Sequence, residues 1–161
     1  MASITRKITP FLWFDKEAEE AANFYVSIFP NSKVGKIARF GAGAPGPEGS
    51  VMTIAFELDG QPFAGINGGP IFKFSEAVSF VVNCADQAEV DHYWDKLTSD
   101  GGKESQCGWL KDRFGLSWQV VPTRLFELIG EDDAARSARV MAAVMQMVKL
   151  DIAKLEAAAR G

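Results

Sequence analysis

Residues 11–29, FLWFDKEAEEAANFYVSIF, decide the fold, because a similar pattern returns 69 residues later in residues 80–98, FVVNCADQAEVDHYWDKLT. Each stretch starts with aromatic or β-branched residues that favour a strand. Apolar residues then recur at spacings of three and four, which predicts an amphipathic helix. At this offset the initial phenylalanines coincide, and Tyr25 falls on Trp94. Unless two amphipathic helices agree by chance, the repeat predicts two paired modules rather than a solenoid.

Three further strands follow the helix in each module. In the first module we predict strands at residues 4–14, 33–40, 50–58 and 61–66, and a helix at 15–29 capped by Asp15. The glycine-rich residues 41–49 predict a loop, and Asp59 with Gly60 predicts a hairpin turn. In the second module we predict strands at residues 78–83, 104–109, 110–113 and 116–121, and a helix at 86–99.

The chain changes character after Pro122, where alanine and other good helix formers dominate. We predict a short helix at 123–129 capped by Thr123, and a further helix starting at Asp151. Between them lies an apolar helical stripe of Val140, Met141, Val144, Met145 and Val148. This stripe predicts packing on the body of the protein or on a partner subunit, in preference to a promiscuous methionine-rich binding face.

The fold class expected from this order is α+β. Two βαβββ modules, at residues 4–70 and 76–122, are expected to form one domain of residues 1–122, followed by a helical extension at 123–161.

The composition of the 161 residues excludes several classes of protein. With 47% hydrophobic and 24% charged residues, the chain resembles an ordinary globular protein rather than a disordered one. A net charge of −4 argues against a nucleic-acid-binding surface. No apolar run approaches the roughly 18 residues that span a bilayer, and no secretory signal is recognisable. We therefore expect a cytoplasmic protein with reduced thiols at Cys84 and Cys107, and with no nucleic-acid or membrane partner.

Familiar catalytic motifs are mostly missing. The one histidine, His92, lies in the middle of a predicted helix, where a surface or structural role is favoured over catalysis. Cys84 and Cys107 are too isolated for a zinc site, and Cys107 has no adjacent base to activate it. The glycines of residues 41–49 lead into a strand, so we do not expect a phosphate-binding loop.

Residues 107–119 are the segment richest in polar and aromatic side chains. Alternation predicts Ser117, Gln119 and Val121 on one face of a strand, with Trp118 on the other. The amide of Gln119 either orients a ligand or bonds to neighbouring backbone. Trp13 and the other tryptophans either line an apolar pocket or fill the core.

Four segments resemble the PhnB-like family: residues 11–14 with the following helix, residues 67–70 (NGGP), residues 80–84 and residues 107–119. This family belongs to the vicinal oxygen chelate superfamily, with glyoxalase I, extradiol dioxygenases and bleomycin-resistance proteins. Its members often carry the label demethylubiquinone methyltransferase. The resemblance covers residues 4–122 and implies paired βαβββ modules that curl a mixed sheet into a cup. It also implies a homodimer, with modules paired within or across chains.

Metal-using relatives in this superfamily place four ligands in the cup. The corresponding positions here are Ile8 or Pro10, Gly65 or Asn67, Ala77 or Ser79, and Gln119. Only Gln119 and, more weakly, Asn67 are credible ligands, and neutral amides do not offset the dehydration of a divalent cation. We therefore expect no metal and no other cofactor. We do not expect S-adenosylmethionine to bind either, because no glycine-rich strand-to-helix motif is present.

The resemblance leaves two main functions open. The first is metal-independent binding of a small, partly aromatic molecule, with Gln119, Ser79 and Asn67 as polar anchors and Trp13 or Trp109 as walls. The second is an enzyme acting on a small molecule: a metal-dependent lyase, isomerase or dioxygenase, or the methyltransferase of the family label. A third, simpler outcome is a dimer whose cup is filled by its own side chains.

Overall fold

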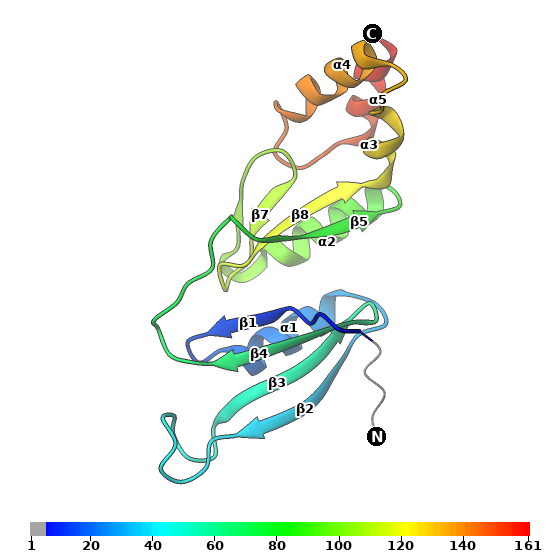
Figure 1. The fold of residues 1–161 in the computed structure, drawn as a ribbon. Coiled ribbons are helices and arrows are strands. Elements are labelled where there is room, and N and C mark those ends of the chain that lie inside the picture. Colours follow the sequence, from blue (N-terminus) through cyan, green and yellow to red (C-terminus); the bar gives the residue numbers. More distant parts are fainter. Residues whose placement is uncertain (1–5) are drawn as a thin grey trace. The chain divides into compact units, whose positions relative to one another are not determined.

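The computed structural model describes residues 6–161, which form two compact units, residues 6–73 and 74–161. Each unit contains a four-stranded mixed sheet with one helix packed on it (Figure 1). Within each unit the chain runs strand, helix and three strands. The predicted α+β class and the two βαβββ modules are therefore confirmed.

The first unit consists of β1 (Phe11–Phe14), α1 (Ala18–Ile28), β2 (Lys33–Arg39), β3 (Val51–Leu58) and β4 (Gln61–Asn67), with the strands in the order β1-β4-β3-β2. β1 is parallel to β4, and the other pairs are antiparallel. The β3–β4 hairpin turns at Asp59 and Gly60, whose φ values of 48° and 75° both lie in the left-handed region that a tight hairpin needs. This turn was predicted from the sequence.

Helix α1 covers one face of the first sheet. Its buried residues are Ala18, Ala21, Ala22, Tyr25 and Ile28. Alternate residues of the strands, among them Phe14 and Ile54, point towards this helix and are buried. The opposite face of the sheet is not covered by this helix and carries Phe11, Trp13 and Ile66.

The second unit contains β5 (Ser79–Cys84), α2 (Gln87–Thr98), a short 3-10 turn (Ser99–Gly101), β6 (Lys103–Glu104), β7 (Trp109–Lys111) and β8 (Ser117–Pro122). The strand order is β5-β8-β7-β6, with β5 parallel to β8. The N-terminus of α2 is capped by the Asp86 side chain, which accepts from the backbone N–H of Glu89 at 2.9 Å. Val90, Trp94 and Leu97 of α2 are buried against the sheet.

Three helices complete the second unit: α3 (Thr123–Leu128), α4 (Ala134–Val144) and α5 (Ile152–Arg160). A helix was predicted to start at Asp151; α5 begins at the next residue, and Asp151 caps it by accepting from the backbone N–H of Lys154. The predicted apolar stripe divides in two. Val140 and Val144 are buried in the core of the extension, whereas Met141 and Met145 are exposed.

Several predicted boundaries were wrong. Residues 6–10 are not a strand, because Pro10 has no N–H to donate, although its carbonyl accepts from Ala64; residues 4 and 5 lie outside the described residues. The cap of α1 is not Asp15: the backbone N–H of Ala18 donates instead to the side chain of Asn67, at 2.8 Å. Thr123 is the first residue of α3 and does not cap it.

The 69-residue offset aligns the helices but not the strands. Tyr25 and Trp94 are both buried at equivalent positions. Three residues separate β1 from α1, whereas two separate β5 from α2, so the strands align at 70 residues. A slip of one residue reverses the face of a side chain. Phe11 accordingly lies on the uncovered face of its sheet, while Phe80 lies on the helix-covered face and contacts Trp118.

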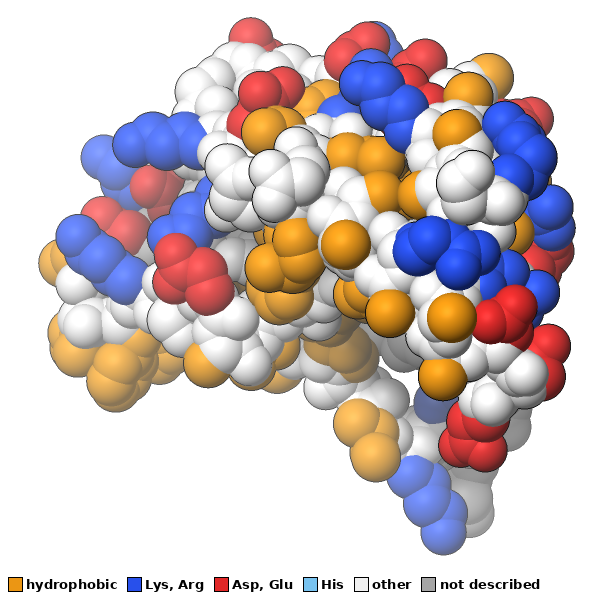
Figure 2. All heavy atoms as spheres, turned by 90° about the horizontal axis from the view of Figure 1, so that it is seen from above, with side chains coloured by type: hydrophobic (Ala, Val, Ile, Leu, Met, Phe, Trp, Pro, Cys, Tyr) orange, Lys and Arg blue, Asp and Glu red, His pale blue; other side chains and the backbone are white. Residues whose placement is uncertain are grey.

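No described helix is both long enough and apolar enough to cross a membrane. Figure 2 shows apolar side chains gathered in patches between basic and acidic ones on the face seen from the side of the C-terminal helices. The exposed apolar residues of residues 123–161 include Phe126, Met141 and Met145.

Candidate functional site

The uncovered face of the second sheet brings together three of the five predicted site residues. Gln119 on β8 pairs with Trp109 on β7, and Ser79 at the start of β5 lies across from Ser117, so all these side chains point to one face. The amide nitrogen of Gln119 donates to the hydroxyl of Ser79 at 2.9 Å. The predicted division of β8, with Ser117, Gln119 and Val121 on one face, is confirmed by this register.

Trp109 differs from the other tryptophans in its hydrogen bonding. The indole N–H groups of Trp13, Trp94 and Trp118 donate to Gly69, Glu104 and Asp112, respectively. The partly exposed indole of Trp109 has no acceptor within residues 6–161. Next to the Gln119 carboxamide, the indole presents both a flat apolar surface and a hydrogen-bond donor.

A buried carboxylate fixes the turn that leads into this face. Asp112 is 3% exposed and accepts from the backbone N–H groups of Phe114 and Leu116 and from the indole of Trp118, at 2.9–3.1 Å. The turn therefore sets where β8 starts, and hence the register that places Gln119 opposite Trp109. Asp112 was not identified from the sequence, where nothing distinguishes it from an exposed turn aspartate.

The accessible part of this face lies between two buried ends. Along β8, Ser117 and Val121 are 1% and 6% exposed, while Gln119 between them is partly exposed. The neighbouring Val81 on β5 is 46% exposed. The buried hydroxyl of Ser117 has no hydrogen-bond partner among the described residues, so a polar group at this end would satisfy it.

The charge on this face is balanced. Lys111, which pairs with Ser117, forms an ion pair with Glu76. This hydrogen bond from Lys111 holds the pKa of the Glu76 carboxyl below its usual range. The groups around Gln119 are therefore a carboxamide, a hydroxyl and an indole, all uncharged, which suits a neutral polar ligand.

The first unit contains a separate cavity of about 850 Å³, within the size range of small-molecule sites. Two of the predicted site residues, Trp13 and Asn67, line it together with Phe40, Met52 and several charged residues. The loop of residues 41–49 forms one side of the cavity. The backbone N–H of Gly49 donates to the carbonyl of Phe40 at 2.8 Å, and this hydrogen bond joins the two ends of the loop.

The NGGP segment is explained by Trp13 and by helix α1. The indole of Trp13 donates to the carbonyl of Gly69 at 2.9 Å and meets the ring of Phe72 edge-on at 4.9 Å. The ring lies so close to Gly68 that a Cβ there would come within 2.2 Å of it. The carboxamide of Asn67 caps α1 and donates to the carbonyl of Val51, so both of its polar ends already have partners.

The residues present do not fit a divalent metal. Of the predicted ligand positions, Ser79 and Gln119 are joined by a hydrogen bond, and they offer a hydroxyl and a neutral carboxamide. Within the described part of the chain, no three His, Cys, Asp or Glu side chains gather closely enough to hold a metal ion. Burial raises the pKa of the Cys84 thiol to about 12, which leaves it a poor ligand and a poor nucleophile.

Neither of the strand-to-helix turns at the start of the two modules is the glycine-rich kind that would bind S-adenosylmethionine. The connections between β1 and α1 and between β5 and α2 are DKE and AD, without glycine. Glycine is what allows a ligand to approach the backbone closely at such a turn. His92, the remaining catalytic candidate, is exposed on α2 beside Tyr93.

Comparison with known proteins places these features in a family. The family model described as 3-demethylubiquinone-9 3-methyltransferase matches residues 6–121. A PhnB protein from Bacillus cereus is 38% identical, with a TM-score of 0.67, and the match covers 73% of this chain and 99% of that chain. No curated protein matches.

More distant solved structures share the fold. Protein PA1353 from Pseudomonas aeruginosa is 20% identical with a TM-score of 0.60, and the match covers 73% of this chain and 98% of that one. The fosfomycin resistance protein FosX from Listeria monocytogenes is 14% identical with a TM-score of 0.58, covering 80% of this chain and all of that one. The chain therefore belongs to the 3-demethylubiquinone-9 3-methyltransferase, or PhnB-like, family.

Proposed function

We propose that this protein binds a small, neutral, partly aromatic molecule without the help of a metal ion. Gln119 and Ser79 are the polar anchors, and Trp109 is the aromatic wall and a further donor. The cavity of the first unit, which Trp13 lines, is a separate candidate site for an apolar molecule. The cup that would join the two modules, the homodimer and the cytoplasmic location remain predictions.

The observation that carries this proposal is the hydrogen bond of 2.9 Å between Gln119 and Ser79, with Trp109 beside it. A polar group that is removed from water is costly unless it is hydrogen-bonded. Here the amide nitrogen of Gln119 donates to Ser79. The side-chain carbonyl oxygen of Gln119 and the indole N–H of Trp109 stay available for a ligand, and both residues are partly exposed.

A thermal-shift screen on metal-free protein tests the proposal. A ligand at 100 times its dissociation constant stabilises a protein by about 2.7 kcal/mol, so aromatic phenols and ketones that bind should raise the melting temperature. The Gln119→Leu variant should lose this shift. The matched control, Gln61→Leu at the hairpin of the first unit, should keep it. If no compound stabilises the protein, or if both variants respond equally, the proposal is wrong.

The alternative is an enzyme, and the family description favours a methyltransferase. FosX from Listeria monocytogenes has been crystallised with Mn(II) and sulfate, which makes metal-assisted chemistry a second form of this alternative. Incubation with Ni, Zn, Mn or Fe, followed by removal of free metal and elemental analysis, distinguishes these functions. Stoichiometric metal binding that is lost in Gln119→Ala would overturn the binding proposal in favour of metal-assisted chemistry. Saturable binding of S-adenosylmethionine would overturn it in favour of a methyltransferase.

A further inference from the structure

The C-terminal extension lies outside the part of the chain that is shared with the family. The family model ends at residue 121, and the PhnB protein from Bacillus cereus is matched over 99% of its own length by 73% of this chain. The helices α3, α4 and α5 therefore follow the part of the chain that the family model matches.

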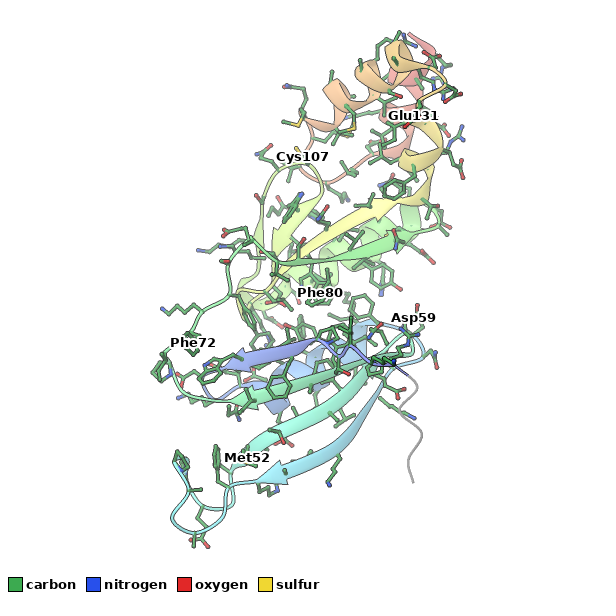
Figure 3. All side chains as sticks on the ribbon, in the orientation of Figure 1. Met52, Asp59, Phe72, Phe80, Cys107 and Glu131 are labelled. Carbon is green, nitrogen blue, oxygen red and sulfur yellow. The ribbon has the colours of Figure 1, made fainter. Side chains whose placement is uncertain are left out.

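This extension is attached to the second sheet through its backbone. The N–H groups of Cys107 and Gly108 donate to the carbonyls of Met147 and Val148, both at 2.8 Å. The chain after α4 thus runs beside the segment that leads into β7, as Figure 3 shows near the labelled Cys107. A Cβ on Gly108 would lie 3.1 Å from Leu150, so the two segments are in close contact.

The extension also covers one end of the ligand-binding face. Val121, two residues beyond Gln119 on the same face, belongs to a buried cluster with Met147, Leu150 and other residues of the extension. Cys107 packs against the same cluster, and its sulfur lies 3.7 Å from that of Met145. The accessible face around Gln119 therefore ends where the extension begins.

We propose that the extension is the end wall of the ligand site, with Met147 setting how long a ligand can be. This inference rests on the proposed binding function. The five residues from Ser117 to Val121 are separated by four strand rises, which span about 13 Å, and both ends are buried. This length of strand face matches a neutral aromatic molecule of one or two rings with a hydroxyl or carbonyl group for Gln119.

Two rigid phenols that differ by one ring test this length limit: 4-phenylphenol and 4-hydroxy-p-terphenyl. Binding is followed by the NMR signals of the Trp109 indole and the Gln119 amide. The unmodified protein should bind the two-ring compound and exclude the three-ring one. Met147→Ala should improve the affinity ratio of the longer over the shorter compound by about tenfold or more, as one additional buried group does in an apolar pocket.

Two further variants complete the test: a larger side chain at Met147, and a control at an exposed methionine. Met147→Phe should weaken the binding of the two-ring compound, so the test stays informative if Met147→Ala does not fold. Met141→Ala, at an exposed position on α4, should leave the ratio unchanged. If 4-phenylphenol binds but the Met147 variants leave the ratio unchanged, the wall is refuted while the binding function stands. If neither compound moves the two signals, both are overturned.

Discussion

Replacing Gly68 with alanine should destabilise the first unit, because the ring of Trp13 occupies the space of the new methyl group. A Cβ at Gly68 would lie 2.2–2.4 Å from three atoms of that ring. Gly68 itself does not have a positive φ, so the effect comes from the contact and not from backbone strain. The indole must move away from the backbone.

The cost follows from the contacts that Trp13 would lose. Its hydrogen bond to the carbonyl of Gly69 contributes about 1 kcal/mol, and its edge-on contact with Phe72 contributes about 1 kcal/mol. We therefore expect Gly68→Ala to lower the free energy of unfolding by about 2 kcal/mol. For a chain of this length that corresponds to a fall in melting temperature of roughly 4–8 °C.

Chemical denaturation followed by tryptophan fluorescence, together with the NMR signal of the Trp13 indole, measures this effect. The matched control is Gly41→Ala, where a Cβ meets no atom within 4 Å and φ is not positive. This control should be neutral or slightly stabilising, since alanine restricts the unfolded chain. If Gly68→Ala is as stable as Gly41→Ala and leaves the Trp13 signal unchanged, the explanation of the NGGP segment is wrong.

Three further predictions concern the second unit. Asp112→Ala should lower the free energy of unfolding by about 3–5 kcal/mol in denaturation experiments, because it leaves buried N–H donors, the indole of Trp118 among them, without their acceptor. In native protein the thiol of Cys84 should resist Ellman's reagent, and stability should fall from about pH 9 towards 12, where only the unfolded thiol ionises. A hydrogen bond from Lys149 lowers the pKa of Asp91, so Lys149→Met should cost at most about 1 kcal/mol at neutral pH. That difference should disappear as the pH falls through the lowered pKa of Asp91, which unfolding curves at several pH values would show.

The fold was largely predictable because its helices carry a strong periodic pattern. Tyr25 and Trp94 were matched correctly, since both must be buried against a sheet in equivalent modules. The strands were matched one residue out of register, because periodicity in the helix says nothing about the length of the turn before it. The exposed Phe11 and the covered Phe80 show how far that single residue changes the outcome.

The candidate site was predictable only where alternation along a strand was clear. The pattern of β8 placed Gln119 on the correct face, and the structure then brought Ser79 to it from a strand 40 residues away. The cap that Asn67 provides to α1 depends on a contact across 49 residues and leaves no local sequence signal. The same is true of Asp112, whose three donors become visible only in the folded turn.

The most direct test of the account is an NMR titration of metal-free protein with 4-phenylphenol. The account predicts saturable shifts of the Trp109 indole and the Gln119 side-chain amide, unchanged affinity after Mn(II) or Zn(II) is added, and loss of the shifts in Gln119→Leu. Shifts that appear only once metal is present, or that leave Trp109 and Gln119 unaffected, would contradict it.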